Sequence, residues 1–238
     1  MTHIGIDGCP AGWVSVTMKS GRFKAVHVFP NIQALWEHHH KAKLILIDMP
    51  IGLVDKGTEP RGCDRAARGE LGLRRSSVFP APLRGVLGCE TYEQACALNH
   101  KRSGKKISKQ TWSIVPKIKE LDTFMRGNEQ ARKKVRESHP EVCFTMLAGG
   151  KPMEHPKKTA VGFMDRLHLI ERFDPSAQDW VRQAADDYPP KQVATDDVID
   201  AMILAIVAAG GERNLQTLPA NPQVDGKGLA MEIVYRQG

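Results

Sequence analysis

Four consecutive apolar residues, Leu44-Ile-Leu-Ile47, are the feature that most restricts how this chain folds. A strand that is apolar on both faces is typical of a parallel sheet with helices on either side, and Pro50 ends this one. Three runs with strand character come first, followed by a predicted helix that Asn31 caps. These four elements are His3–Asp7, Trp13–Met18, Phe23–Phe29 and Ile32–His40. The order is therefore β-β-β-α-β, with an antiparallel meander at its start.

Two aspartates end strands that are predicted to be neighbours. A right-handed crossover through a helix allows the first and fourth strands to lie parallel and adjacent. Asp7 ends the first strand and Asp48 the fourth. Neighbouring strands lie about 4.8 Å apart, so both carboxylates are expected to face one small volume. Each could instead be a local turn or cap residue, but the topology independently brings the pair together, and we favour a functional site.

A third source of carboxylates is the final predicted helix, Asp196 to Ala209, with Thr195 as its expected N-cap. Asp197 and Asp200 are three residues apart and share a helical face that continues as apolar residues towards the core. A carboxylate in the first turn is explained by the helix dipole alone, but Asp200 lies beyond that turn. Clustered hard oxygen ligands suit Mg²⁺ or Mn²⁺.

The rest of the chain completes an α/β domain over residues 1–238, with a mixed five-stranded sheet flanked by helices and a helical insertion at about 55–130. Neither a linker nor an internal repeat divides it. The further predicted elements are helices at Cys63–Leu71, Tyr92–Leu98 and Ile114–Met125, a strand at Lys134–Ser138, helices beginning at Pro140 and spanning Thr159–Phe173, and a tail strand at Leu229–Tyr235. In the Thr159–Phe173 helix, Val161, Met164, Leu167 and Ile170 are expected to face the core.

Basic residues outnumber acidic ones by 34 to 27, which gives a net charge of +7. The excess gathers in two segments, Lys101–Lys106 and Arg132–Arg136. Such segments bind polyanions in some proteins and are solvated helix ends in others. The charge therefore permits a nucleic-acid partner without requiring one.

Several features bear on location and on other kinds of site. The five cysteines are scattered without a Cys-x-x-Cys pair, and we expect reduced thiols. No secretory signal or membrane-spanning run is recognisable, which favours the cytoplasm. The run His38–His40 is expected to be an exposed helix end, because three consecutive helical side chains point in different directions.

Five separated motifs together resemble the family catalogued as domain of unknown function 429. They are Gly5–Trp13, Ile47–Leu53, Ser76–Pro82, Ser108–Trp112 and His139–Val142. The resemblance runs from Gly5 to about Ala208. It implies a nuclease with a ribonuclease H-like fold, because that family is regarded as predicted nucleases of this kind.

The final helix segment Asp197–Ala201 also resembles the closing motif of the Holliday-junction resolvase branch of that fold, which supplies metal-binding acids. The resemblance places Asp7 on the first strand, Asp48 on the fourth, and Asp197 with Asp200 on the last helix. The glutamate that ribonuclease H carries on its first helix has no counterpart here, since Glu37 lies beside the histidine run. Glu141 or Glu120 would have to replace it.

These observations lead us to expect a metal-dependent phosphodiester hydrolase in which two Mg²⁺ or Mn²⁺ ions are held by Asp7, Asp48 and Asp200. Asp197 and Glu141 would assist in catalysis. The residues expected to contact nucleic acid are Lys105, Lys106, Lys133, Lys157 and Lys158. The alternatives are an actin- or sugar-kinase-like phosphotransferase or ATPase, and a non-catalytic nucleic-acid-binding module. The sequence does not distinguish DNA from RNA as the substrate, and it does not give the oligomeric state.

Overall fold

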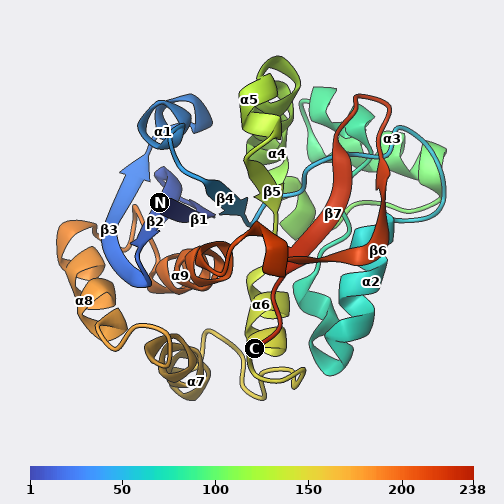
Figure 1. The fold of residues 1–238 in the computed structure, drawn as a ribbon. Coiled ribbons are helices and arrows are strands. Elements are labelled where there is room, and N and C mark those ends of the chain that lie inside the picture. Colours follow the sequence, from blue (N-terminus) through green and yellow to red (C-terminus); the bar gives the residue numbers. More distant parts are fainter.

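A computed structural model describes residues 1–238, and its central feature is a mixed five-stranded sheet in the order β3-β2-β1-β4-β5. The strands are β1 (Thr2–Cys9), β2 (Gly12–Lys19), β3 (Arg22–Phe29), β4 (Leu44–Ile47) and β5 (Val135–Glu137). The first three pair antiparallel, whereas β1, β4 and β5 are parallel to one another (Figure 1). The predicted α/β fold with a ribonuclease H-like sheet arrangement is confirmed.

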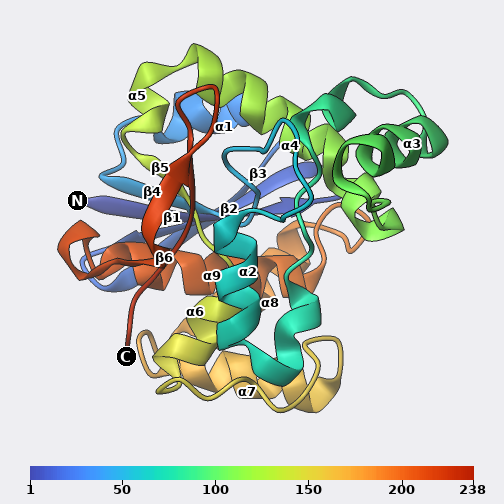
Figure 2. The ribbon, with the colours of Figure 1, turned by 90° about the vertical axis from the view of Figure 1, so that its right-hand side faces the viewer.

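Helices cover both faces of this sheet, as the apolar β4 requires (Figure 2). On one side lie α1 (Ile32–His39), α4 (Lys109–Gly127) and α5 (Glu129–Arg132). On the other side lie α6 (Pro140–Leu147), α7 (Ala160–Glu171), α8 (Ala177–Asp187) and α9 (Thr195–Ala209). Asn31 caps α1 as predicted, because its side chain accepts a hydrogen bond from the amide of Ala34.

Strand alternation divides the apolar residues between two cores. Ile4 and Ile6 of β1 pack in the core that contains α1 and α4, together with Ile45 and Ile47 of β4. Leu46 packs in the other core, which contains α9. Residues that alternate with the isoleucines therefore face α9, and Asp7 and Asp48 continue that alternation.

Helix α9 packs directly on β1. Its residues from Val198 to Ala208 are all buried, and its backbone lies against Gly5. A Cβ atom on Gly5 would come within 2.0 Å of the Ala201 carbonyl oxygen. This close approach brings the first turns of α9 to the end of β1 at which Asp7 lies.

The insertion contributes α2 (Gly62–Glu70), α3 (Tyr92–Ser103) and two short 3₁₀ helices, Gly72–Ser77 and Arg84–Gly88, as well as α4. Arg84, whose side chain is 9% exposed, joins it to the C-terminal hairpin by pairing with Asp122 and Asp225. That hairpin consists of β6 (Gln216–Val224) and β7 (Ala230–Tyr235). None of the helices has the length and apolar character needed to cross a membrane.

Three expectations about individual elements were wrong or incomplete. The tail strand forms, but it pairs with β6 in a separate two-stranded sheet. Neither β6 nor α8 was predicted, because β6 carries Pro219 and Pro222 and is largely exposed, and α8 buries only three small side chains. Of the four α7 residues expected to face the core, Leu167 and Ile170 do so, whereas Val161 and Met164 are exposed.

Two expectations about helix ends also need correction. The N-cap of α9 is Ala194 rather than Thr195, because the helix begins one residue earlier and the Asp197 side chain accepts the Ala194 amide at 3.1 Å. His39 is not part of an exposed helix end. It is buried, and its Nε2 atom lies 2.9 Å from the Ser15 hydroxyl of β2.

Candidate metal centre

The register of the two central parallel strands brings Asp7 and Asp48 together. Ile6 pairs with Ile47, and the amide of Asp48 donates to the Ile6 carbonyl at 2.9 Å, so the next residues of both strands are neighbours. Asp200 approaches from α9. One carboxylate oxygen from each of Asp7, Asp48 and Asp200 lies within 4.8 Å of the others. We call these three residues the aspartate cluster.

Burial opposes ionisation throughout the aspartate cluster. Asp7 and Asp200 are 8% and 3% exposed, and Asp48 is half-buried. Burial raises the pKa of Asp7 well above its usual range, and the negative charges of Asp48 and Asp200 raise it further. Burial also raises the pKa of Asp200 to about 6. Bringing these carboxylates together costs free energy that a bound cation would relieve.

Asp197 lies beside the aspartate cluster rather than in it. Its side chain caps α9 through the Ala194 amide, and burial raises its pKa to about 6. The charge of Asp197 also contributes to the raised pKa of Asp7. Asp197 thus adds negative potential while supporting the first turn of the helix that carries Asp200.

Lys157 supplies the positive charge at this site. Its ammonium is hydrogen-bonded to Asp200 Oδ2 and lies 3.4 Å from Asp196 Oδ2. Burial lowers the pKa of Lys157, but the carboxylates of Asp200 and Asp7 outweigh that effect and raise it overall. The neighbouring Lys158 is exposed. Of the predicted nucleic-acid contacts, these two lie nearest to the carboxylates.

The structure does not bring Glu141 into the aspartate cluster. Both of its carboxylate oxygens accept hydrogen bonds from the buried Arg166, at 2.9 and 2.7 Å. Glu120 is also engaged elsewhere, by the Trp13 indole at 3.1 Å and by the Ile32 amide. Neither candidate for the fourth carboxylate therefore joins the aspartate cluster. Glu141 is the ion-pair partner of Arg166, and Glu120 binds the first amide of α1.

Strand direction separates the remaining predicted lysines. Lys133 lies two residues before β5, at the amino edge of the parallel strands, whereas the aspartate cluster lies at the carboxyl edge. It is exposed and paired with Glu129 at 2.8 Å. Lys133 therefore lies apart from the aspartate cluster, and its contact with nucleic acid stays a prediction. Lys105 and Lys106 line a cavity of about 220 Å³ in the insertion, whose helix α3 lies beyond the carboxyl edge (Figure 2).

His139 is the residue whose position the sequence pattern did not settle. It lies two residues after the end of β5, and its positive form would lower the pKa of Asp48. Its Nε2 donates to the Ser77 carbonyl at 3.3 Å, so in the neutral ring Nδ1 carries a lone pair. That Nδ1 atom is buried without a hydrogen-bond partner. In the sequence, the feature that pointed to His139 was the motif His139–Val142, which begins directly after a predicted strand.

A second group of potential ligands, Cys63, Asp64 and Glu137, has a cation of its own. The buried Arg61 donates to both oxygens of Glu137 at 2.7 Å and to Asp64 at 2.5 Å. Burial also raises the pKa of the Cys63 thiol far above its usual range. The guanidinium group occupies this cluster, which leaves the aspartate cluster as the candidate metal centre.

The donor set of the aspartate cluster fits a divalent cation. It offers three convergent carboxylates, and a buried imidazole nitrogen without a partner lies nearby. Carboxylate oxygens are preferred by Mg²⁺ and Mn²⁺, and metal-binding histidines commonly donate their second ring nitrogen to a backbone carbonyl, as His139 does. Asp7, Asp48 and Asp200 are the residues that would hold the ion.

Comparisons with known proteins agree with the resemblance seen in the sequence. No curated protein and no solved structure matches this chain. One family model, described as a protein of unknown function (DUF429), matches residues 5–224, which is nearly the whole chain. The chain therefore belongs to the DUF429 family.

Proposed function

We propose that this protein is a divalent-metal-dependent phosphodiester hydrolase that acts on nucleic acid. The observation that carries the proposal is the aspartate cluster, in which three carboxylates from β1, the end of β4 and α9 converge within 4.8 Å at the carboxyl edge of the sheet. Two of the three are almost fully buried. The single ammonium of Lys157 leaves three clustered carboxylates with unbalanced negative charge, which a divalent cation would relieve and which argues against a purely structural role.

The residues of the site have different roles in this reaction, in which water attacks the phosphorus atom and the P–O bond to the leaving group breaks. Asp7, Asp48 and Asp200 hold the metal, and Asp197 adds negative potential beside them. Divalent cations in such a site activate a water molecule and stabilise the leaving oxygen. We call the solvent side of the Lys157–Asp200 pair the mouth of the site, and an ammonium group of Lys157 or of the exposed Lys158 would neutralise a substrate phosphate there.

Charge supports a nucleic-acid substrate. The chain carries a net charge of +7, and Lys105 and Lys106 lie on the insertion at the carboxyl side of the sheet. Sequence-independent binding of nucleic acid depends mainly on such phosphate contacts. No particular contact or cavity favours the kinase-like phosphotransferase or the non-catalytic binding module over the hydrolase.

Asp7→Asn provides the direct test. The amide keeps the shape of the side chain but removes the charge that a metal ligand needs, so we expect Mn²⁺-dependent cleavage of a mixed panel of DNA and RNA to fall at least about a hundredfold. Removing one buried anion also relieves repulsion, so the metal-free variant should melt at or above the wild-type temperature.

The exposed Asp186 on α8 provides a matched control, and Asp186→Asn should leave cleavage and melting unchanged. Saturating Mn²⁺ should raise the melting temperature of the wild type, because a ligand that binds only the folded state stabilises it. Equal cleavage by wild type and Asp7→Asn, or no effect of Mn²⁺ on wild-type melting, would reject the proposed function.

A further inference from the structure

Lys157 is the only cation that contacts the aspartate cluster. Within 4.0 Å, neither Asp7 nor Asp48 has an ion-pair partner, and the partner of Asp200 is the Lys157 ammonium. Asp196, one turn earlier on α9, lies 3.4 Å from the same ammonium. In the metal-free protein one lysine thus balances a concentration of negative charge that would otherwise be uncompensated.

The backbone that carries Lys157 is held in place by two arginines. Arg74 donates to the carbonyls of Met153 and Glu154 at 2.8 and 3.0 Å, and Arg166 donates to the carbonyl of His155 at 3.1 Å. The next carbonyl, Pro156, accepts hydrogen bonds from the amide and hydroxyl of Thr159. Four successive carbonyls before Lys157 are therefore engaged.

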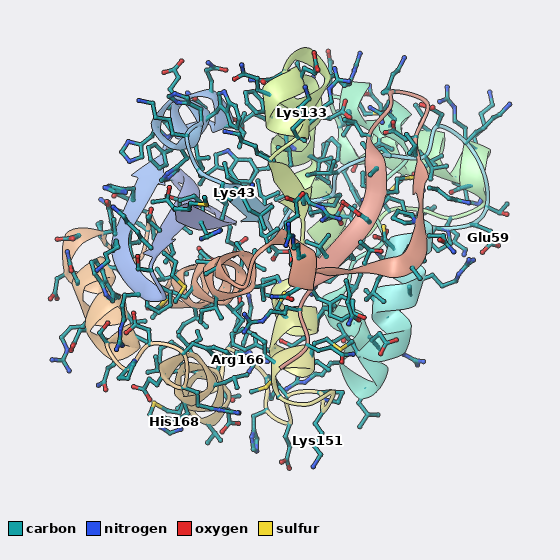
Figure 3. All side chains as sticks on the ribbon, viewed as in Figure 1. Lys43, Glu59, Lys133, Lys151, Arg166 and His168 are labelled. Atoms are coloured by element: carbon teal, nitrogen blue, oxygen red, sulfur yellow. The ribbon has the colours of Figure 1, made fainter.

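Glu141 holds these two arginines in place. The glutamate expected to take part in catalysis therefore has a structural role. Its carboxylate binds Arg166 through both oxygens and lies 3.8 Å from Arg74 Nε (Figure 3 labels Arg166, between α6 and α7). It keeps two cations beside the segment that they hold. Because the backbone is anchored, the four-carbon side chain is the part of Lys157 that is free to change position.

The two ends of the Lys157–Asp200 pair differ in exposure. The Lys157 side chain is 36% exposed, whereas that of Asp200 is 4% exposed. The ammonium thus reaches the carboxylate from the solvent side and can withdraw without opening the core around α9. A divalent cation arriving from solvent requires the same Asp200 oxygens and is repelled by the ammonium.

We propose that Lys157 is a built-in counter-cation that a divalent metal must displace from Asp200, so that Lys157 sets the metal affinity of the site. This inference rests on the proposed function, because it concerns the metal of the same centre. In the metal-free state Lys157 stabilises the folded acid cluster. After exchange its ammonium is released at the mouth of the site, beside the position proposed for the substrate phosphate.

The test is Mn²⁺ binding by titration calorimetry at low salt and about pH 8, where protons compete little with the metal for the carboxylates. Lys157→Gln should bind Mn²⁺ at least about tenfold more tightly than wild type, because the competing charge is gone. Lys157→Arg, which keeps a cation, should stay within about threefold of wild type. If Lys157→Gln does not fold, the more conservative Lys157→Met replaces it.

Lys151→Gln is the matched control. Lys151 belongs to the same loop between α6 and α7, is exposed at its outer end and has no ion pair, so its loss removes one charge without opening the site (Figure 3). Its Mn²⁺ affinity should stay within about twofold of wild type. If Lys151→Gln and Lys157→Gln gained equally in Mn²⁺ affinity, the gain would come from the change in net charge alone, and the inference would be overturned.

The remaining outcomes separate this inference from the proposed function. If wild type binds Mn²⁺ and Lys157→Gln binds it equally or more weakly, the exchange is wrong and the metal site stands. If neither protein binds Mn²⁺, the metal site itself is wrong and the inference falls with it. If only Lys157→Gln binds Mn²⁺, the ammonium excludes the metal from the wild-type protein, so no exchange takes place and both the inference and the proposed function are overturned.

Discussion

At the scale of single residues, the candidate site balances buried carboxylates against one ammonium. Burial raises the pKa of Asp7 and Asp200, whereas the charge of Lys157 favours their ionised forms. The half-buried Asp48 follows β4, which is the strand that pairs with β5 at the side of the sheet. The charge of Lys157, and of His139 in its protonated form, lowers the pKa of Asp48 against the effect of burial. The character of the site thus depends on residues outside the aspartate cluster as well as on its three members.

His139 is predicted to influence which metal the centre prefers. Its Nδ1 lone pair is buried without a partner, and its other nitrogen is fixed by the Ser77 carbonyl. Imidazole nitrogen binds Co²⁺ more readily than Mg²⁺. We therefore expect His139→Gln to weaken Co²⁺ binding about tenfold and Mg²⁺ binding much less, as measured by titration calorimetry.

His168→Gln is the matched control for that substitution, because His168 is exposed on the outer face of α7 (Figure 3). It should leave both affinities unchanged. An identical loss of Co²⁺ and Mg²⁺ affinity in His139→Gln would mean that His139 supports the loops around the site and has no ligand character.

At the scale of secondary-structure elements, the position of α9 on β1 decides whether Asp200 meets Asp7. Gly5 permits that contact, since a Cβ there would collide with the backbone at Ala201 and Ala205. We expect Gly5→Ala to lower the free energy of unfolding by about 1–3 kcal/mol or more, because the helix must shift. Mn²⁺ affinity should fall with it, because Asp200 moves with α9.

Urea unfolding and Mn²⁺ titration of the same variant check this prediction. Gly69→Ala on α2 is the control, because no atom lies within 4 Å of the added Cβ and alanine favours a helix. The control should be as stable as wild type or more so. A Gly5→Ala variant with wild-type stability would show that α9 is not packed as described.

The packing of α1 against β2 predicts a pH dependence. Burial lowers the pKa of His39 to about 3, so the folded protein keeps this ring neutral while the unfolded chain protonates it near pH 6.5. Between these values the unfolded state binds more protons, so stability falls as the pH is lowered from about 6.5 towards 3. The loss approaches about 1.4 kcal/mol per pH unit.

His39→Gln should remove this contribution, and the comparison with wild type isolates it from the carboxylates, which act in the opposite direction. The exposed His168 on α7 provides the control, and His168→Gln should keep the wild-type dependence. Unfolding free energies measured from pH 7 to pH 4 give the slopes. Parallel curves for wild type and His39→Gln would contradict the assignment.

At the scale of the whole molecule, strand direction assigns the basic segments to different edges of the sheet. Lys105 and Lys106 follow α3 of the insertion, and this helix lies beyond the carboxyl edge of the parallel strands, at which the aspartate cluster lies. Lys133 lies at the amino edge. A substrate that reaches the aspartate cluster is therefore expected to contact the insertion and to leave Lys133 free.

The salt dependence of nucleic-acid binding tests this arrangement. Each phosphate contact contributes about 0.9 to the slope of log K against log salt for duplex DNA. Replacing both Lys105 and Lys106 with glutamine should reduce the steepness by up to about 2, and Lys133→Gln should leave it unchanged. An equal reduction by Lys133→Gln would place the nucleic acid elsewhere on the surface.

Local sequence patterns were sufficient for the β-β-β-α-β order, the buried strand β4 and the meeting of Asp7, Asp48 and Asp200. The reason is that these features follow from strand alternation, helical spacing and the rule that parallel strands end at one edge. Two of the five DUF429 motifs, Gly5–Trp13 and Ile47–Leu53, lie on these elements or directly after them, and the five motifs together gave the family. The helix that carries Asp200 was predicted for the same reason, although its cap was displaced by one residue.

Only the tertiary structure decided the partners of Glu141, the approach of Lys157 to Asp200 and the separation of Lys133 from the site. Glu141 and Arg166 are 25 residues apart, and Lys157 and Asp200 are 43 apart. No helical or strand period links positions so distant. Their contacts follow from how α6, α7 and α9 pack on one face of the sheet, and charge alone does not distinguish a metal ligand from an ion-pair partner of a buried arginine.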